Sequence, residues 1–314
     1  MMNRPWTIPL LLGTLVVASG FADFRIRQSP EYAYSEYIPR VIDRSYGAPA
    51  IYRVLVPYAN TWIVSKTAWS PAVVWHLTRL SWFALAYVAI YALMRTWFSS
   101  AAALGSVCSV AATLPLTYTN SWAHPDSIPE LALFSLGCLC IVRELDAWFA
   151  LVLVVAALNR ETSAFLVAAY AFARSPTWSH AWRTGVAAAI WLAIFVGLRL
   201  WRGVEHYDYW QLTRNLEFMK LLPPAYDVYK RFYAWFLVIL AGPAYVVVAL
   251  NWRAVPGPAR GLLAASIPML ITALLFSSII ETRIFIPLYP LLLPAVMFAL
   301  LGPKPNTGEP SRVA

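Results

Sequence analysis

Short polar clusters interrupt an otherwise apolar chain, and their residue types are those of acid–base and anion-binding sites. Asp23 follows the first apolar run, Asn159-Arg160-Glu161-Thr162 interrupts a later one, and Glu281-Thr282-Arg283 precedes the last one. A guanidinium group can hold phosphate through parallel N–H bonds, and a carboxylate can act as a general base or a metal ligand. These clusters therefore predict a site for an anionic substrate.

Two further clusters combine histidine with acids. His124 and Asp126 flank Pro125, and Glu205 is followed by His206. These four residues are candidates to contact an acceptor or a metal ion. The spacing of His124 and Asp126 around a proline does not fit one helix face, so both would act from a loop. As an alternative, Asp126 caps the helix that follows.

Each cluster also has a structural interpretation, which the sequence leaves open. Asp23 can end its helix and pair with Arg25 or Arg27, and the adjacent acids can neutralise Arg160 and Arg283. Arginines at helix ends also reach lipid headgroups without any further role. An ionisable pair inside an apolar segment nonetheless favours a functional site.

The composition excludes a soluble globular domain and a disordered chain. The 314 residues are 60 % hydrophobic and 12 % charged, with a mean hydropathy of +0.60. That charged share is about half of what soluble domains carry. The net charge is +9, but the basic residues separate apolar runs, as they do in the loops of membrane proteins, so nucleic acid is not expected as a partner. The three cysteines and four histidines form no disulfide framework or zinc motif.

The apolar runs predict an all-α, polytopic membrane protein with about eight transmembrane helices in a single domain, 1–301. Each run is close to the roughly 20 residues that cross the hydrocarbon core. The first run is interpreted as a retained helix rather than a cleaved signal peptide. Prolines 287, 290 and 294 should bend the last one. The expected helices cover residues 6–22, 72–94, 98–118, 127–142, 184–201, 232–250, 261–280 and 284–301.

Three segments are expected outside these spans. Residues 23–71 form a first extracytoplasmic loop, within which 51–69 lies as a helix in the membrane interface. Residues 203–231 form a second large extracytoplasmic loop, and 302–314 form a disordered cytoplasmic tail.

Residues 147–173 allow two structures. A single helix would place Arg160 and Glu161 near the bilayer midplane, which is costly unless they are paired or solvated. Two half-helices, 147–158 and 162–173, would instead form a re-entrant hairpin with the polar tetrapeptide at its tip. The two options give opposite topologies for the rest of the chain.

The positive-inside rule favours the hairpin. With it, both termini are cytoplasmic and the polar clusters converge on the extracytoplasmic face of the inner membrane. The cytoplasmic ends then carry three acids, Glu144, Asp146 and Glu309, and nine bases: Arg4, Arg95, Arg143, Arg174, Arg183, Arg253, Arg260, Lys304 and Arg312.

With this layout the chain resembles the GT-C class of bacterial integral membrane glycosyltransferases. Asp23 matches the acidic residue that follows the first helix in that class. Tyr52-Arg53-Val54-Leu55-Val56-Pro57 in the first loop, the cluster at 159–162 and the stretch from Glu281 to Pro287 are also similar. The chain departs from better-studied members because Phe24, not a second acid, follows Asp23, and because no large soluble C-terminal domain is present.

The resemblance implies transfer of a sugar, with inversion, from a polyprenyl-phosphate donor to an extracytoplasmic glycan, lipid or protein. Asp23 would be the catalytic base. Arg53, Arg160, Glu161, Glu281 and Arg283 would bind the substrate and its phosphate. A divalent cation, Mg²⁺ or Mn²⁺, is a possible cofactor, although a single acid after the first helix argues against tight binding.

Other functions remain open at this stage. A transporter or flippase for lipid-linked or anionic envelope precursors would usually show internal repeats with paired broken helices, and only one broken segment is visible. A polymerase-type enzyme combines the same features as a glycosyltransferase. A noncatalytic partner of an envelope assembly complex is also compatible with the sequence.

Overall fold

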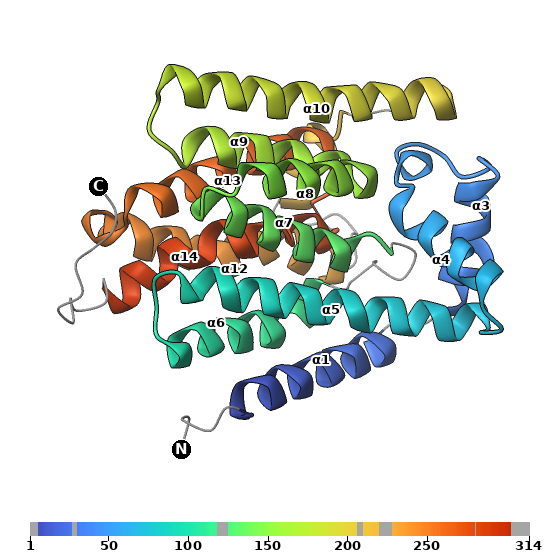
Figure 1. Ribbon diagram of the computed structural model, residues 1–314, viewed down its shortest axis with the longest axis horizontal. Helices are drawn as coiled ribbons and strands as arrows, with labels where there is room; N and C mark the ends of the chain where they lie inside the picture. The colour runs from blue at the N-terminus through green and yellow to red at the C-terminus, as the bar shows by residue number, and fades with distance from the viewer. Residues whose placement is uncertain are drawn as a thin grey trace.

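The computed structural model describes residues 6–26, 30–117, 125–205, 210–219, 228–279 and 281–302. All regular elements in these ranges are helical, which confirms the predicted all-α class for the described chain. Figure 1 shows the long helices packed side by side, with α3 (Ile38–Ile42) and α4 (Leu55–Lys66) gathered at one end of the bundle. That end is called the site end below, because the polar clusters lie there.

Among the described residues, five helices are long and apolar enough to cross a membrane. This finding agrees with a polytopic membrane protein, but it does not establish the expected number of eight spans. Of the other three predicted spans, α7 (Ser127–Val142) and α14 (Leu288–Leu301) are shorter, and α12 (Val228–Leu250) is described only in part. The five lie in α1 (Thr7–Ile26), α5 (Pro71–Arg95), α6 (Ser100–Thr113) with the 3-10 turn η3 (Leu114–Thr117), α10 (Trp178–Arg202) and α13 (Gly257–Phe276).

Capping side chains mark the starts of the two longest helices, α5 and α10. Ser70 Oγ accepts from Val73 N at the start of α5, where Pro71 occupies the first turn. Thr177 Oγ1 accepts from His180 N, so α10 begins well before the predicted residue 184. The short connection between α9 and α10 is therefore residues 173–177.

The predicted break in residues 147–173 is confirmed. α8 (Asp146–Asn159) ends at Arg160, whose φ/ψ of −157°/147° is extended, and a 3-10 turn, η4 (Glu161–Ser163), leads into α9 (Ala164–Phe172). The chain folds back here, because Asp146 at the start of α8 accepts from Tyr170 and Arg174 at the end of α9, at 3.0 and 2.7 Å. The polar tetrapeptide therefore forms the tip of a helical hairpin.

The hairpin is clamped between neighbouring helices. α9 packs along α13, and Gly261 of α13 allows the contact, because a Cβ there would lie 2.2 Å from both Ala173 Cα and Phe172 O. α8 packs on α7 and α10. One apolar core joins these helices to α5, α6 and α14.

The first predicted loop begins later than expected. α1 continues to Ile26, so Asp23 lies in its last turn rather than after it. A short helical stretch follows, made of α2 (Pro30–Tyr32), a π-helical turn η1 (Ala33–Tyr37) and α3. The expected interfacial helix at 51–69 is present in shortened form as a 3-10 turn, η2 (Ala50–Tyr52), and α4.

Two other boundaries differ from prediction. The loop predicted at 203–231 contains α11 (Leu212–Met219), and α12 already begins at Val228. The last helix does not start at residue 284, because a 3-10 turn, η6 (Thr282–Phe285), precedes Pro287 and α14 starts only after that proline. The 3-10 turn η5 (Trp252–Ala254) connects α12 to α13. The tail beyond Gly302 lies outside the described residues.

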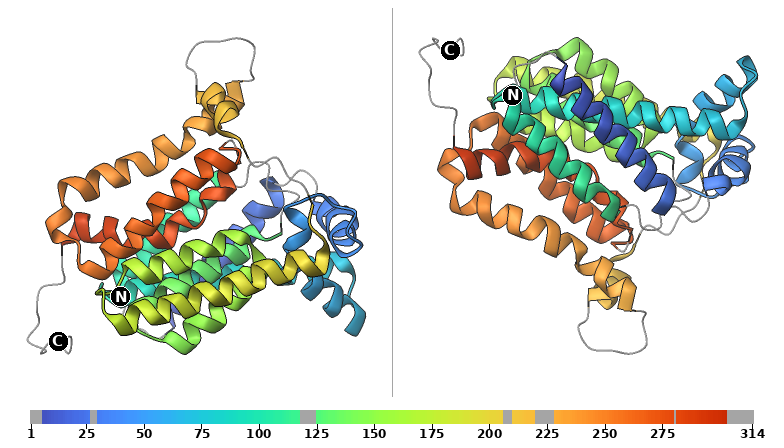
Figure 2. Two further views of the ribbon diagram at one scale, coloured as in Figure 1. Left: turned by 90° about the horizontal axis from the view of Figure 1, so that it is seen from above. Right: turned by 90° about the horizontal axis from the view of Figure 1, so that it is seen from below.

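Both described chain ends lie at the end of the bundle opposite α3 and α4. Figure 1 and the right view of Figure 2 show the start of α1 and the end of α14 toward that end. Asp146, Arg174 and Arg183 meet at the same opposite end through ion pairs of 2.7 and 2.5 Å. The hairpin therefore leaves the polar clusters at 53, 126, 160 and 283 together at the site end.

Candidate functional site

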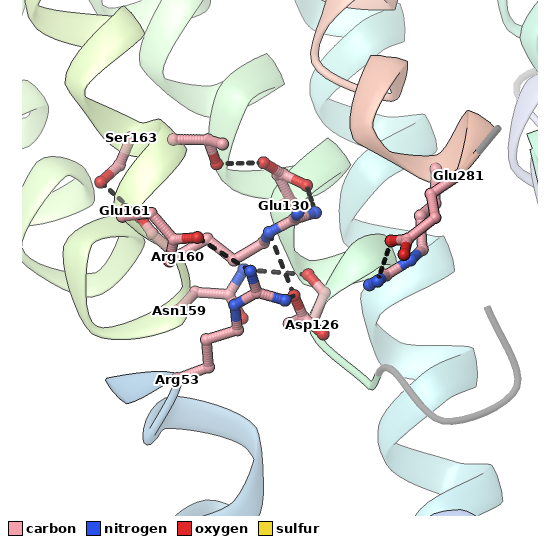
Figure 3. Close-up of polar contacts among 10 residues, drawn as sticks. Arg53, Asp126, Glu130, Asn159, Arg160, Glu161, Ser163 and Glu281 are labelled. Carbon is pink, nitrogen blue, oxygen red and sulfur yellow. Dashed lines mark hydrogen bonds and ion pairs between the residues drawn. The ribbon is translucent and has the colours of Figure 1, made fainter. Parts of the chain in front are cut away.

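Four segments that are distant in the sequence bring charged side chains together at the site end. Arg53 follows η2 in the first loop, and Asp126 and Glu130 lie at the start of α7. Arg160 and Glu161 form the hairpin tip. Figure 3 shows these residues converging on Asp126, with Glu281 on the side of Asp126 opposite the hairpin tip.

Asp126 lies between two arginines. Its Oδ2 accepts from Arg53 Nη1 at 3.2 Å and forms an ion pair with Arg160 Nε at 3.1 Å. Arg53 Nη2 donates to Glu161 Oε1 at 2.8 Å, and Arg160 Nη1 donates to Glu130 Oε2. Acids and arginines thus alternate along one chain of contacts (Figure 3).

Further hydrogen bonds fix the hairpin tip in this arrangement. Thr162 Oγ1 donates to Glu130 Oε1, and Asn159 Nδ2 donates to the Asp126 carbonyl at 2.9 Å. Ser163 Oγ donates to the Arg160 carbonyl at 2.7 Å and accepts from Trp191 Nε1 of α10 at 3.0 Å. Each residue of the tip except Glu161 is therefore bound to α7, to α10 or to the tip itself.

The cluster is largely buried. Arg53, Asp126, Glu130 and Arg160 are each at most 6 % exposed, whereas the Glu161 side chain retains 31 % of its exposure. Buried charges are tolerated when they are paired and hydrogen-bonded, and that condition is met here. The crevice lined by Glu130, Arg160 and their neighbours is too narrow for a water molecule. Glu161 is therefore the carboxylate of this group that a substrate can reach.

Arg53 and Glu161 each stabilise the charged form of the other. Burial lowers the pKa of Arg53, but the carboxylates of Glu161 and Asp126 outweigh it and raise that pKa well above its usual value. Burial raises the pKa of Glu161, but Arg53 and Arg160 outweigh it and hold that pKa below its usual range. Both groups therefore stay charged at neutral pH.

Arg283 differs from the other two arginines because most of its donors are unused. It is 4 % exposed and donates through Nη2 to Glu281 Oε2 at 2.5 Å, whereas Nε and Nη1 are buried with no acceptor among the described residues. Burial lowers the pKa of Arg283, and Glu281 only partly offsets this. A buried guanidinium with open N–H groups is suited to receive an anion.

Asp23 lies in a separate pair. Its two carboxylate oxygens accept from Arg79 Nε and Nη2 of α5 at 2.7 and 2.8 Å, and both side chains are buried. Trp75 stacks beneath the Arg79 guanidinium. The expected pairing with Arg25 or Arg27 concerns side chains outside the described residues. Arg79 is therefore a partner that the sequence analysis missed, although a lone arginine within an apolar helix is itself a signal.

Of the remaining predicted site residues, the structure describes Glu205 and Asp126. Glu205 Oε2 accepts from Ala48 N at 2.8 Å, so it binds the first loop rather than the charged cluster. Asp126 does occupy the residue before α7, but its carboxylate faces Arg53 and Arg160 instead of capping the helix, which corrects the alternative interpretation. His124 and His206 lie outside the described residues.

The described residues do not fit a metal site. Within them, no group of three or more His, Cys, Asp and Glu side chains is placed to hold a metal ion. The carboxylates of the cluster are instead bound to arginines.

Comparisons with known proteins identify no relative. No family model, no curated protein and no solved structure matches this chain.

Proposed function

We propose that the protein is an integral membrane glycosyltransferase that moves a sugar from a polyprenyl-phosphate carrier to an extracytoplasmic acceptor, with inversion. The observation that carries this proposal is the buried Arg283 guanidinium, whose Nε and Nη1 have no acceptor among the described residues, close to the carboxylates of the charged cluster at the end of an apolar bundle. The resemblance to GT-C enzymes in Asp23, Arg53 and the clusters at 159–162 and 281–287 supports the same function.

Arg283 is the residue proposed to hold the donor phosphate. Its Nε and Nη1 can donate to phosphate oxygens, and its partner Glu281, 37 % exposed, can move aside. The other two arginines are each already bound by two carboxylates, so an anion would have to displace one of them. Arg53 and Arg160 therefore contribute mainly by holding the acids in place.

Glu161 is the carboxylate best placed to act as the base. It lies across Asp126 from Glu281, so a sugar whose phosphate is bound at Arg283 would present its other face toward Glu161 (Figure 3). The carboxylate takes the proton of the acceptor hydroxyl, the hydroxyl oxygen bonds to the anomeric carbon, and the carbon–oxygen bond to the phosphate breaks. The polyprenyl phosphate leaves with that electron pair. Asp23 is the second candidate for the base. It ranks below Glu161 because both of its carboxylate oxygens accept hydrogen bonds from Arg79.

A transfer assay tests this proposal. Proteoliposomes receive a radiolabelled polyprenyl-phosphate hexose and a panel of octyl glycosides as acceptors. Label should appear in an octyl glycoside with inverted anomeric configuration. Glu161→Gln should reduce the rate by about 100-fold or more, the usual contribution of a general base. Arg143→Gln, an exposed residue at the opposite end, should leave it unchanged.

The same assay separates the alternatives. Movement of the intact donor across the bilayer without transfer would support a transporter instead. Loss of activity in Asp23→Asn with full activity in Glu161→Gln would assign the base to Asp23 and contradict the role of Glu161.

A further inference from the structure

Arg202, the last residue of α10, donates several hydrogen bonds to the first loop. Arg202 is 4 % exposed, and its guanidinium donates to the Ile51 carbonyl at 3.2 Å, the Ile42 carbonyl at 3.3 Å and the Val41 carbonyl. It also donates to Tyr58 Oη at 3.0 Å. All four acceptors are neutral and lie in residues 41–58. Arg202 therefore joins the end of α10 to this part of the first loop.

Residues next to Arg202 in the sequence also bind the same loop. Tyr52 Oη donates to the Gly203 carbonyl at 2.9 Å and accepts from Glu205 N at 3.1 Å. The guanidinium of Arg199 lies 4.5 Å from the centre of the Tyr52 ring. Both the ring and the hydroxyl of Tyr52 are therefore held by residues at the end of α10. Because Arg53 is the next residue in the chain, these contacts also restrict the position of Arg53.

α10 also fixes the partner of Arg53. Trp191 Nε1 donates to Ser163 Oγ at 3.0 Å, and Ser163 Oγ donates to the Arg160 carbonyl at 2.7 Å. The hairpin tip that carries Glu161 is therefore attached to the middle of α10, while the loop that carries Arg53 is attached to its end. One helix sets the positions of both members of the Arg53–Glu161 ion pair.

We infer that Arg202 is a positioning residue, which places Arg53 against Glu161 and Asp126 by fixing residues 41–58 to the end of α10. An arginine suits this task because its planar fork can serve several carbonyls at once, whereas a lysine ammonium offers one point of contact. The inference rests on the proposed function only in treating Glu161 as the base. The geometric statement about Arg53 stands without it.

Hydrogen–deuterium exchange on the intact protein in lipid nanodiscs tests the inference without any substrate. The protein variants are Arg202→Gln, Arg202→Lys and Arg53→Gln, and the peptides read out cover residues 41–58 and 159–164. Arg183→Gln is the matched control, because Arg183 lies on the same helix but binds Asp146 at the opposite end. Because no reaction is measured, a failure of the transfer assay does not affect the outcome.

Arg202→Gln should raise exchange about fivefold or more in 41–58, and it should raise exchange in 159–164 to the level of Arg53→Gln. Arg202→Lys should restore part of the protection in both peptides, and Arg183→Gln should change neither. Faster exchange in 41–58 with wild-type exchange in 159–164 would overturn the inference, because Arg202 would then stabilise only the loop that it contacts.

If Arg202→Gln does not fold, Tyr52→Phe provides the same test, because it removes only the hydroxyl contacts to Gly203 and Glu205. It should raise exchange in both peptides by a smaller factor. Unchanged exchange in 159–164, despite faster exchange in 41–58, would again contradict the inference.

Discussion

Asp126 is the residue on which the charged cluster depends, because it bridges Arg53 and Arg160. Replacing it with asparagine would leave two buried guanidinium groups short of one negative charge. Breaking a buried ion pair costs about 3 kcal/mol or more. We therefore expect Asp126→Asn to lower Tm clearly, even though each arginine keeps one other carboxylate.

A thiol-reactive dye can follow this unfolding, since Cys138 and Cys140 are buried in the native state. The exposed Cys108 is first replaced by serine. Glu36→Gln is the control, because that side chain is exposed and should hardly affect Tm. Equal Tm values for the two variants would show that Asp126 is not central to the cluster.

Glu161 should make stability depend on pH in a defined direction. Its pKa is raised by burial but lowered further by Arg53 and Arg160, so the net shift is downward. A carboxylate with a lowered pKa stabilises the fold above its unfolded pKa, and this contribution is lost as the pH falls through the folded pKa. Below about pH 4.5, Tm of the wild type should therefore fall more steeply than Tm of Glu161→Gln. If Tm of the wild type and Tm of Glu161→Gln fell in parallel from about pH 8 to below about pH 4.5, the stabilising ion pair between Glu161 and Arg53 would be contradicted.

The sequence identified many site residues by type, and it identified Glu281 as the neighbour that pairs with Arg283, but it could not identify partners that are distant in the chain. Arg160, Glu161 and Arg283 stand out because charges are rare in apolar runs. Asp126 and Arg53 are 73 residues apart, and no local pattern predicts their contact. The pairing of Asp23 with Arg79, 56 residues away, was missed for the same reason.

At the scale of elements, the contact between α9 and α13 depends on the absence of a side chain at Gly261. A Cβ there would lie 2.2 Å from Ala173 Cα, a backbone atom that cannot move aside. Overpacking of this kind costs about 1–3 kcal/mol. Gly261→Ala should therefore lower Tm and loosen the returning half of the hairpin.

Gly257→Ala is the matched control for this prediction. It lies on the same helix, and a Cβ there meets no atom within 4 Å. The dye assay used for Asp126 can measure both variants. A Tm for Gly261→Ala at or above that of Gly257→Ala would contradict the close approach of α9 and α13.

Helix existence was predictable from hydropathy, whereas helix boundaries depended on local chemistry. Ser70 and Thr177 cap α5 and α10, and the second cap moved the start of α10 to residue 178. Pro287 delayed α14, because a proline ring favours the first turn of a helix over its interior. The cost of burying Arg160 and Glu161 disfavoured one continuous span, and the positive-inside rule then favoured the hairpin.

At the scale of the whole molecule, exposed tryptophans mark both ends of the bundle. Trp182 and Trp201 of α10 are both exposed and lie about 28 Å apart along the helix, close to the roughly 30 Å thickness of the hydrocarbon core. Tryptophan is enriched at membrane interfaces. This spacing supports a membrane placement with the charged cluster toward one face.

Cysteine labelling tests which face that is. In a cysteine-free background, Ser45→Cys at the site end should react with an impermeant thiol reagent applied to the outside of intact cells. Thr177→Cys at the opposite end should react only after the membrane is opened, because both side chains are exposed in the fold but lie on opposite sides. Labelling of Thr177→Cys from outside would reverse the proposed orientation.

The central claim is that the site end binds a polyprenyl-phosphate-linked sugar through Arg283. Native mass spectrometry of the purified protein with a synthetic polyprenyl-phosphate hexose measures this directly, with phosphatidylglycerol as the competing anionic lipid. We predict one bound donor per chain for the wild type and for Arg143→Gln, and at least tenfold weaker binding for Arg283→Gln. Equal binding by wild type and Arg283→Gln, or no preference over phosphatidylglycerol, would contradict the claim.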